Sequence, residues 1–325
     1  MKNKLRIFIT GLGMGAADLV PGVSGGTIAF IFGIYEELIQ SIKTVTGRSL
    51  QLLFKGQMKE AVRSVPFGFL IPLGIGILTA IISLSHLIAY LLAEQPIYLW
   101  SFFFGLVIAS IFIVGRRVVN WDAHDVLATV ASAFGAYLLV GIVPVETPTN
   151  LLWFFGSGAI AIIAMILPGI SGSFILVILG KYGQVLEAVN NRDLLPLIAV
   201  AAGCALGIAL FSRALSWLFT HHHDITIAVL TGFLIGSLRK IWPWKVPVLT
   251  TTDRHGEIVP ILEENILPQI NTELAVAVGL MIFGTTLMWF FEKIQATKHH
   301  VDDINDKAYE KKHKQAVKAE QHEQI

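Results

Sequence analysis

The sequence has a single cysteine, Cys204, and only 14% of its residues are charged. One cysteine excludes a disulfide framework and a cysteine metal site. Soluble domains carry about 25% charged residues. The low charge, with 54% hydrophobic residues and a mean hydropathy of +0.68, therefore indicates a polytopic membrane protein.

Several chemical signatures are also missing. There is no Walker-type loop, nucleophile elbow or zinc signature, so the sequence predicts neither ATP-driven transport nor hydrolysis, and no catalytic residues. The adjacent histidines at 221–223 have one acidic neighbour, Asp224, and predict no metal site. The basic residues lie beside hydrophobic spans, where membrane topology requires them, and predict no nucleic-acid partner.

What the sequence does contain is one motif twice. Residues 21–26 read Pro-Gly-Val-Ser-Gly-Gly and residues 168–173 read Pro-Gly-Ile-Ser-Gly-Ser, an offset of 168 − 21 = 147. Proline and glycine break helices, so each copy interrupts a segment that would otherwise span a membrane. Broken apolar segments at corresponding places in two halves are typical of a transporter's binding site.

The remaining apolar segments predict an all-α polytopic membrane protein with two inverted repeats. Two long segments, each containing a break, are expected to form re-entrant helical hairpins. Three spans follow each hairpin, and because three is odd the second repeat is inverted relative to the first. The first repeat is predicted at 1–143, with hairpin 5–39, interfacial segment 40–66 and spans 67–93, 97–115 and 126–143; the second at 144–291, with hairpin 151–187 and spans 195–219, 225–241 and 273–291; and a cytoplasmic tail at 292–325.

The distribution of charge predicts the orientation. Lysine and arginine gather at the N-terminus, in 40–66 and in the tail, whereas the loops 94–96 and 144–150 have neither. By the positive-inside rule both termini are cytoplasmic. The basic and apolar residues of 40–66 suit a helix lying on the cytoplasmic leaflet, and 242–272 is expected outside.

The motif itself is a candidate anion site. Ser24 and Ser171 are placed to cap the helix that begins after each break. The residues that follow, Gly25, Gly26, Gly172 and Ser173, are small, so their backbone N–H groups can approach a ligand closely. The alternative is that each motif is a kink that allows close helix packing, and the sequence leaves both open.

These motifs, with Gly-Phe-Leu-Ile-Gly-Ser-Leu-Arg-Lys-Ile-Trp-Pro-Trp at 232–244, resemble the bacterial undecaprenyl phosphate translocase family over about residues 5–291. The resemblance implies a transporter of the inner membrane that returns this polyprenyl phosphate lipid from the outer to the cytoplasmic leaflet for cell-envelope synthesis. It implies no enzyme activity and no cofactor. A small inorganic anion channel or exchanger remains the alternative, and the oligomeric state stays open.

The charged residues near span ends complete the candidate site. Arg239 and Lys240 are candidates for capturing phosphate outside, or else they snorkel to the interface; Arg116 and Arg117 could receive it inside, or else are ordinary positive-inside charge. An inside-negative potential opposes inward anion movement by about 2.3 kcal/mol per charge per 100 mV. Co-transport of protons or sodium would offset this, with Asp18, Glu36 and Glu37 as the candidate carboxylates.

Overall fold

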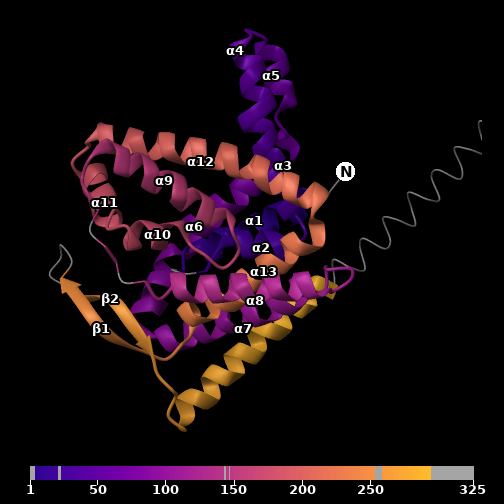
Figure 1. Ribbon diagram of the computed structural model, residues 1–325. Coiled ribbons are helices and arrows are strands. Elements are labelled where there is room, and N and C mark those ends of the chain that lie inside the picture. The colour runs from indigo at the N-terminus through magenta and orange to yellow at the C-terminus, as the bar shows by residue number, and fades with distance from the viewer. Residues whose placement is uncertain (1–3, 21–22, 143, 146, 253–257, 294–325) are drawn as a thin grey trace, which may run out of the picture.

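The computed structural model describes residues 4–20, 23–142, 144–145, 147–252 and 258–293, and it is helical apart from one two-stranded sheet (Figure 1). The first half holds α1 (Lys4–Asp18), α2 (Gly25–Ile31), α3 (Tyr35–Thr44), a π-helical turn (Val45–Ser49), α4 (Leu50–Phe54), α5 (Met58–Ser64), α6 (Phe67–Glu94), α7 (Pro96–Gly115) and α8 (Ala123–Leu139). The second half holds α9 (Leu151–Ile166), α10 (Gly172–Ile178), α11 (Tyr182–Asn190), α12 (Leu194–His221), α13 (His223–Ile241), the antiparallel pair β1 (Lys245–Thr252) and β2 (Ile258–Asn265), and a last helix, Thr272–Lys293.

Four helices in the described residues are long and apolar enough to cross a membrane, namely α6, α7, α12 and Thr272–Lys293. If the bent pair α10 and α11 is counted as one broken span, the number of possible membrane spans rises to five. Of the other two expected spans, α8 has 17 residues, and α13 carries Asp224, Arg239 and Lys240 within its 19. The protein is therefore a multi-pass membrane protein.

Each hairpin differs from the expected pair of half-helices, because its returning limb is itself divided. Gly33 and Gly180, which are equivalent at the 147-residue offset, both have positive φ angles, of 64° and 63°. Residues with a side chain rarely adopt this conformation, and it turns the chain between α2 and α3 and between α10 and α11. The second bend is 103°. Each half thus has a long first helix, a seven-residue helix after the break and a bent-back third helix.

The first helix of each hairpin packs closely on the 28-residue helix of its own half: α1 packs on α6, and α9 packs on α12. A Cβ added to Gly76 of α6 would collide with the carbonyl oxygen of Phe8, and one added to Gly203 of α12 would collide with that of Phe155. Phe8 and Phe155 are again 147 residues apart. Glycine here lets two backbones touch, as small residues do between membrane helices.

This packing predicts a sharp difference between two glycines of the same helix. We expect Gly76→Leu to destabilise the protein by more than about 2 kcal/mol, because the added side chain must separate α1 from α6. Gly74→Leu should be nearly neutral, since nothing lies within 4 Å of its added Cβ. Thermal unfolding in detergent checks this, and equal loss in both variants would show that the contact is not tight.

The last helix of each half packs against the other half. Gly232 and Gly236 of α13 lie against α8, at the carbonyl oxygens of Thr129 and Ala133. Gly105 of α7 lies in the same way against Met281 of the last helix. The two halves are therefore interlocked.

Segments predicted on the same side of the membrane lie together. At one end, Arg117 after α7 donates to the carbonyl oxygen of Ile31 at 3.2 Å, and His223 lies 3.7 Å from Glu36. At the other end, Lys181 donates to the carbonyl oxygens of Thr147 and Pro148, and α10, α11 and the β1–β2 hairpin lie along one edge of the molecule (Figure 1). Which end faces the cytoplasm remains a prediction from charge.

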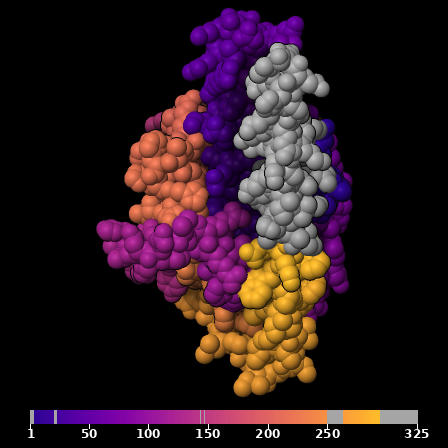
Figure 2. All heavy atoms as spheres, turned by 90° about the vertical axis from the view of Figure 1, so that its right-hand side faces the viewer, coloured from indigo at the N-terminus to yellow at the C-terminus, as the bar shows by residue number. Residues whose placement is uncertain are grey.

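The predicted interfacial segment forms an arm that projects from the helix bundle (Figure 2). Its two short helices, α4 and α5, expose large apolar side chains, with Phe54 87% and Met58 62% exposed. Lys55 and Lys59 lie beside them in sequence. The combination of exposed apolar and basic residues suits contact with an anionic lipid surface.

Candidate anion-binding site

The two copies of the motif meet in the centre of the fold. The hydroxyl of Ser24 lies 3.3 and 3.4 Å from the carbonyl oxygens of Met165 and Leu167, which directly precede the second copy. The N–H of Gly169 donates to Thr27 Oγ1 at 3.1 Å. Pro21 and Gly22 of the first copy lie outside the described residues. Two segments about 140 residues apart in the chain thus form one contact region.

In the first copy, side chains of the protein itself accept the hydrogen bonds of the backbone N–H groups that could bind a ligand, so we call this copy closed. The N–H of Gly25 donates to Asp18 Oδ1 at 2.7 Å, and the N–H of Gly26 donates to Ser24 Oγ at 3.1 Å. All seven residues of α2 are buried. The expectation that Gly25 and Gly26 present free amides is therefore wrong in this structure, because the Asp18 carboxylate already supplies an anion there.

The second copy is open. The side chain of Ser171 makes no capping hydrogen bond with α10; its hydroxyl instead lies 2.8 Å from that of Ser173. Ser173 is exposed, whereas Gly172 is buried. A pair of hydroxyls at the start of a helix, with no carboxylate in the position of Asp18, is accessible to a ligand. Met165 occupies the position equivalent to Asp18 at the 147-residue offset.

The two basic residues at the end of α13 point to different neighbours. Lys240 Nζ lies 5.0 Å from the centre of the Phe174 ring, in the residue that directly follows the second copy. Arg239 donates to the carbonyl oxygen of Tyr137 in α8 at 3.0 Å, and its guanidinium stacks over the Tyr137 ring. The structure therefore brings Lys240, and not Arg239, to the open motif.

Two charged residues that the sequence analysis did not select lie beside Lys240. Glu263 Oε2 of β2 is 3.7 Å from Lys240 Nζ and 3.6 Å from the Nζ of Lys245 in β1. Lys245 is stacked on the Trp100 ring, and its side chain is only 8% exposed. The pKa of Lys245 is lowered to about 8, mainly by burial; the negative charge of Glu263 opposes this shift, and the positive charge of Lys240 contributes to it.

Strand pairing explains why these residues were missed. Glu263 faces Pro247 across the two-stranded sheet, next to Lys245. The two are 18 residues apart in a segment that reads only as a proline-containing external loop. The one available signal was a lysine beside Trp242 and Trp244, in a region where the positive-inside rule disfavours lysine.

The arginines predicted on the cytoplasmic side lie toward the opposite end of α2. Arg117 lies over the Phe30 ring, 5.1 Å from its centre, and burial lowers its pKa. Arg6 donates to the carbonyl oxygen of Phe32 at 2.8 Å. Guanidinium groups at the carboxyl end of a helix complement its dipole. Arg117 thus holds the end of the closed motif.

The remaining candidates lie near this end of the molecule. Glu36 is paired with His223, which also contacts Asp224 at 3.2 Å. Glu37 follows in the first turn of α3, and Arg116 is exposed. The structure brings none of these groups to the open motif. Among the described residues, no group of three His, Cys, Asp or Glu side chains could hold a metal ion.

Comparison with known proteins identifies the family. The family model described as undecaprenyl phosphate translocase-like matches residues 14–259 of the chain. The chain belongs to this family. The resemblance inferred from the two motifs is thus confirmed, and the translocase-like family consists of transporters rather than enzymes.

Two curated relatives are similar over most of the chain. A polyprenyl-phosphate transporter of Vibrio cholerae is 43% identical over 266 residues, covering 82% of this chain and 86% of the relative. A polyprenyl-phosphate transporter of Staphylococcus aureus is 35% identical over 257 residues, covering 72% of this chain and 85% of the relative. No solved structure matches this member of the translocase-like family.

Proposed function

We propose that this protein carries undecaprenyl phosphate, a polyprenyl phosphate lipid, from the outer to the cytoplasmic leaflet of the bacterial inner membrane, where it is reused in cell-envelope synthesis. The observation that carries the proposal is the open second motif, in which Ser173 is exposed and Ser171 half-buried, with Lys240 over the ring of the next residue, Phe174. The names of the two relatives support the choice of substrate.

The chemistry of this site suits the headgroup. A phosphate monoester carries about −1.5 to −2 charges at pH 7 and accepts several hydrogen bonds. Moving such an anion uncovered into hydrocarbon costs several kcal/mol even after relaxation. Two hydroxyls and the Lys240 ammonium replace part of its hydration at the point of entry, while the polyprenyl chain stays in the lipid.

Asp18 supports a proposal for coupling. Its carboxylate accepts a hydrogen bond from the N–H of Gly25 in the closed motif, and the residue itself remains exposed. Binding of a proton or a sodium ion by Asp18 would remove the anion from that amide and offset the charge of the phosphate. Glu36 and Glu37 are second candidates, because they lie in the first turn of α3 and the charge of Glu36 acts on Arg117.

The similarity of the two halves supports alternating access by inverted repeats. Each half turns at an equivalent glycine and packs its first helix on its long helix through equivalent residues. In this structure one motif is closed and the other open. If the first motif opened while the second closed, the accessible site would move from one side of the membrane to the other.

A reconstituted transport assay tests this function. In proteoliposomes, a short-chain prenyl phosphate should move between leaflets at a rate set by the protein, and chloride should not. Chloride flux without movement of the lipid would contradict the proposal in favour of an inorganic anion channel or exchanger.

The two adjacent basic residues provide a matched pair for the same assay. We expect Lys240→Ala to slow lipid movement about tenfold, corresponding to about 1.4 kcal/mol of lost stabilisation. Arg239→Ala should affect protein stability more than transport, because Arg239 holds Tyr137 of α8. The reverse order of effects on transport would place the headgroup elsewhere.

A further inference from the structure

Beside the open motif, Lys240 forms a group with Lys245 and Glu263, two residues that the sequence motifs did not select. Both ammonium groups are directed to the same oxygen, Glu263 Oε2, at 3.7 and 3.6 Å. These distances are those of ion pairs rather than short hydrogen bonds. Among the described residues, Lys245 Nζ has no hydrogen-bond partner although it is buried.

The charges of this group do not balance. Two ammonium groups share one carboxylate, so a single positive charge is left over while Lys245 is protonated. A buried ammonium without hydrogen bonds is costly unless an anion satisfies it. The aromatic rings of Trp100 and Phe174 flank the two lysines and offer no full negative charge. The group therefore carries one positive charge that no carboxylate of the group neutralises.

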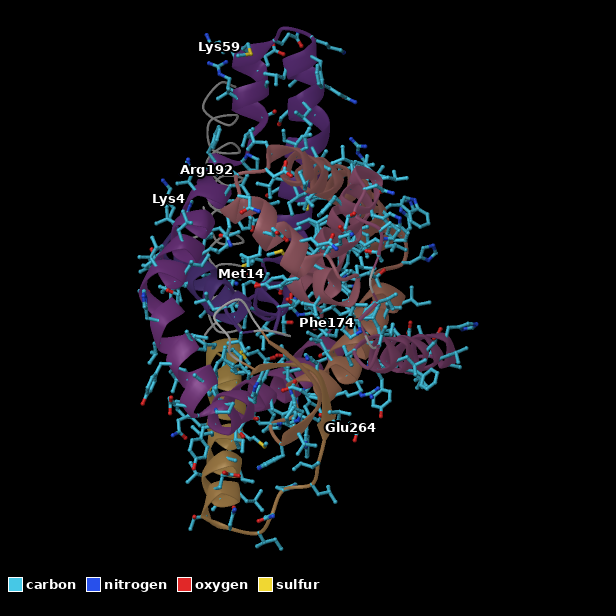
Figure 3. All side chains as sticks on the ribbon, turned by 90° about the vertical axis from the view of Figure 1, so that its left-hand side faces the viewer. Lys4, Met14, Lys59, Phe174, Arg192 and Glu264 are labelled. Atoms are coloured by element: carbon cyan, nitrogen blue, oxygen red, sulfur yellow. The ribbon has the colours of Figure 1, made fainter. Side chains whose placement is uncertain are left out.

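The position of the group links it to the open motif. Phe174, which contacts Lys240, directly follows Ser173 in the chain. Figure 3 shows Phe174 of α10 and Glu264, the neighbour of Glu263 on β2, on the same side of the molecule. Exposure decreases from Glu263 (29%) and Lys240 (25%) to Lys245 (8%), so the innermost charge is the ammonium of Lys245.

We propose that Lys240 and Lys245 form an anion-exchange site in which Glu263 is the resident anion, displaced by a phosphate monoester headgroup. This inference rests on the proposed function and adds the selection of the headgroup. Displacing Glu263 leaves two positive charges, which a dianionic monoester neutralises. A phosphodiester, with one negative charge, only replaces one monoanion by another and gains nothing from the exchange.

The physical consequence is selectivity against ordinary phospholipids. Membrane phospholipids are phosphodiesters and greatly outnumber any polyprenyl phosphate. Because Glu263 already occupies the site, a monoanionic headgroup must compete with this carboxylate for the two lysines. The site therefore selects against phosphodiesters by charge rather than by shape. Glu263 thus acts as a specificity-determining residue, and Lys245 as a headgroup ligand.

The test uses full-length protein in phosphatidylcholine nanodiscs. Affinity is measured for two probes, a short-chain prenyl monophosphate and its methyl diester. The wild type should bind the monophosphate at least about tenfold more tightly than the diester. If the wild type does not bind the monophosphate at all, the proposed function fails, and this result is separate from the arms below.

The two variants are expected to change binding in opposite directions. Glu263→Gln removes the competitor, so diester affinity should rise at least about fivefold and the preference should shrink. Lys245→Met keeps the packing on Trp100 but loses the charge, and should weaken monophosphate binding about tenfold. Glu264→Gln, a neighbouring and exposed carboxylate on β2, is the matched control and should change neither affinity. An unchanged preference in Glu263→Gln, or weaker monophosphate binding in it, would overturn the inference.

A measurement on the wild type avoids dependence on the folding of variants. With a pKa of about 8 for Lys245, raising the pH from 7 to 9 removes most of its charge, and monophosphate binding should fall. The other charged groups facing Lys245, namely Lys240 and Glu263, are also present in Lys245→Arg, so comparing the two proteins isolates the effect of Lys245. Lys245→Arg should bind equally at both pH values. Binding by the wild type that does not change with pH would contradict a ligand role for Lys245.

Discussion

Asp18→Asn is expected to lower polyprenyl phosphate transport at least about tenfold while leaving the protein folded. The asparagine side chain can still accept the hydrogen bond from Gly25, now at 2.7 Å, so the closed motif should stay capped. It cannot bind a proton or change its charge, however. If Asp18 couples transport to an ion, the variant loses the driving force and any response of transport to a pH gradient.

A second helix-capping aspartate provides the control. Asp193 accepts a hydrogen bond from Leu195 N at 3.3 Å at the start of α12, so Asp193→Asn makes the same chemical change at a cap outside the motifs. Transport and its pH response should stay at the wild-type level. Wild-type transport by Asp18→Asn, with the pH response intact, would remove Asp18 from the coupling mechanism.

The serines of the two motif copies should separate stability from transport. Ser24 is buried and bonded on both sides, so Ser24→Ala should cost about 1 kcal/mol of stability or more. The side chain of Ser171 makes no capping hydrogen bond, and Ser173 lies inside α10. Their joint replacement by alanine should leave stability nearly unchanged and slow transport about tenfold, because the headgroup loses two hydroxyl partners.

The same set of variants decides between a ligand site and a kink. Thermal unfolding and leaflet-to-leaflet transport are measured on each protein, and transport is corrected for the amount of folded protein. If the Ser171 and Ser173 variant transports normally, the second motif is only a kink with close packing. If Ser24→Ala loses transport without losing stability, the closed copy also contacts the substrate.

The sequence predicted the large features of this fold because they follow from local chemistry. Proline and glycine at 21–22 and 168–169 break helices wherever they occur. The apolar segments between polar loops are set by membrane thickness. The division of each returning limb was not predicted, although the equivalence of Gly33 and Gly180 was visible. Only the φ angle shows that these glycines turn the chain.

The candidate site was predicted in part for the same reason. The serines and small residues of both motifs could be placed at helix starts, because capping is a local pattern. The capture of Gly25 by Asp18, seven residues earlier, depends on how the chain turns between them. Arg239 and Lys240 differ because successive helix residues point about 100° apart. Lys245 and Glu263 meet through strand pairing, which no motif encodes.

The central claim is that a phosphate headgroup enters at the open second motif. It is tested most directly by a structure of the protein in nanodiscs with a short-chain prenyl monophosphate bound. We expect the phosphate between the Ser173 hydroxyl and the ammonium groups of Lys240 and Lys245, with the Glu263 carboxylate moved away. A phosphate bound only near Arg116 and Arg117, with Ser173 and Lys240 empty, would contradict the account.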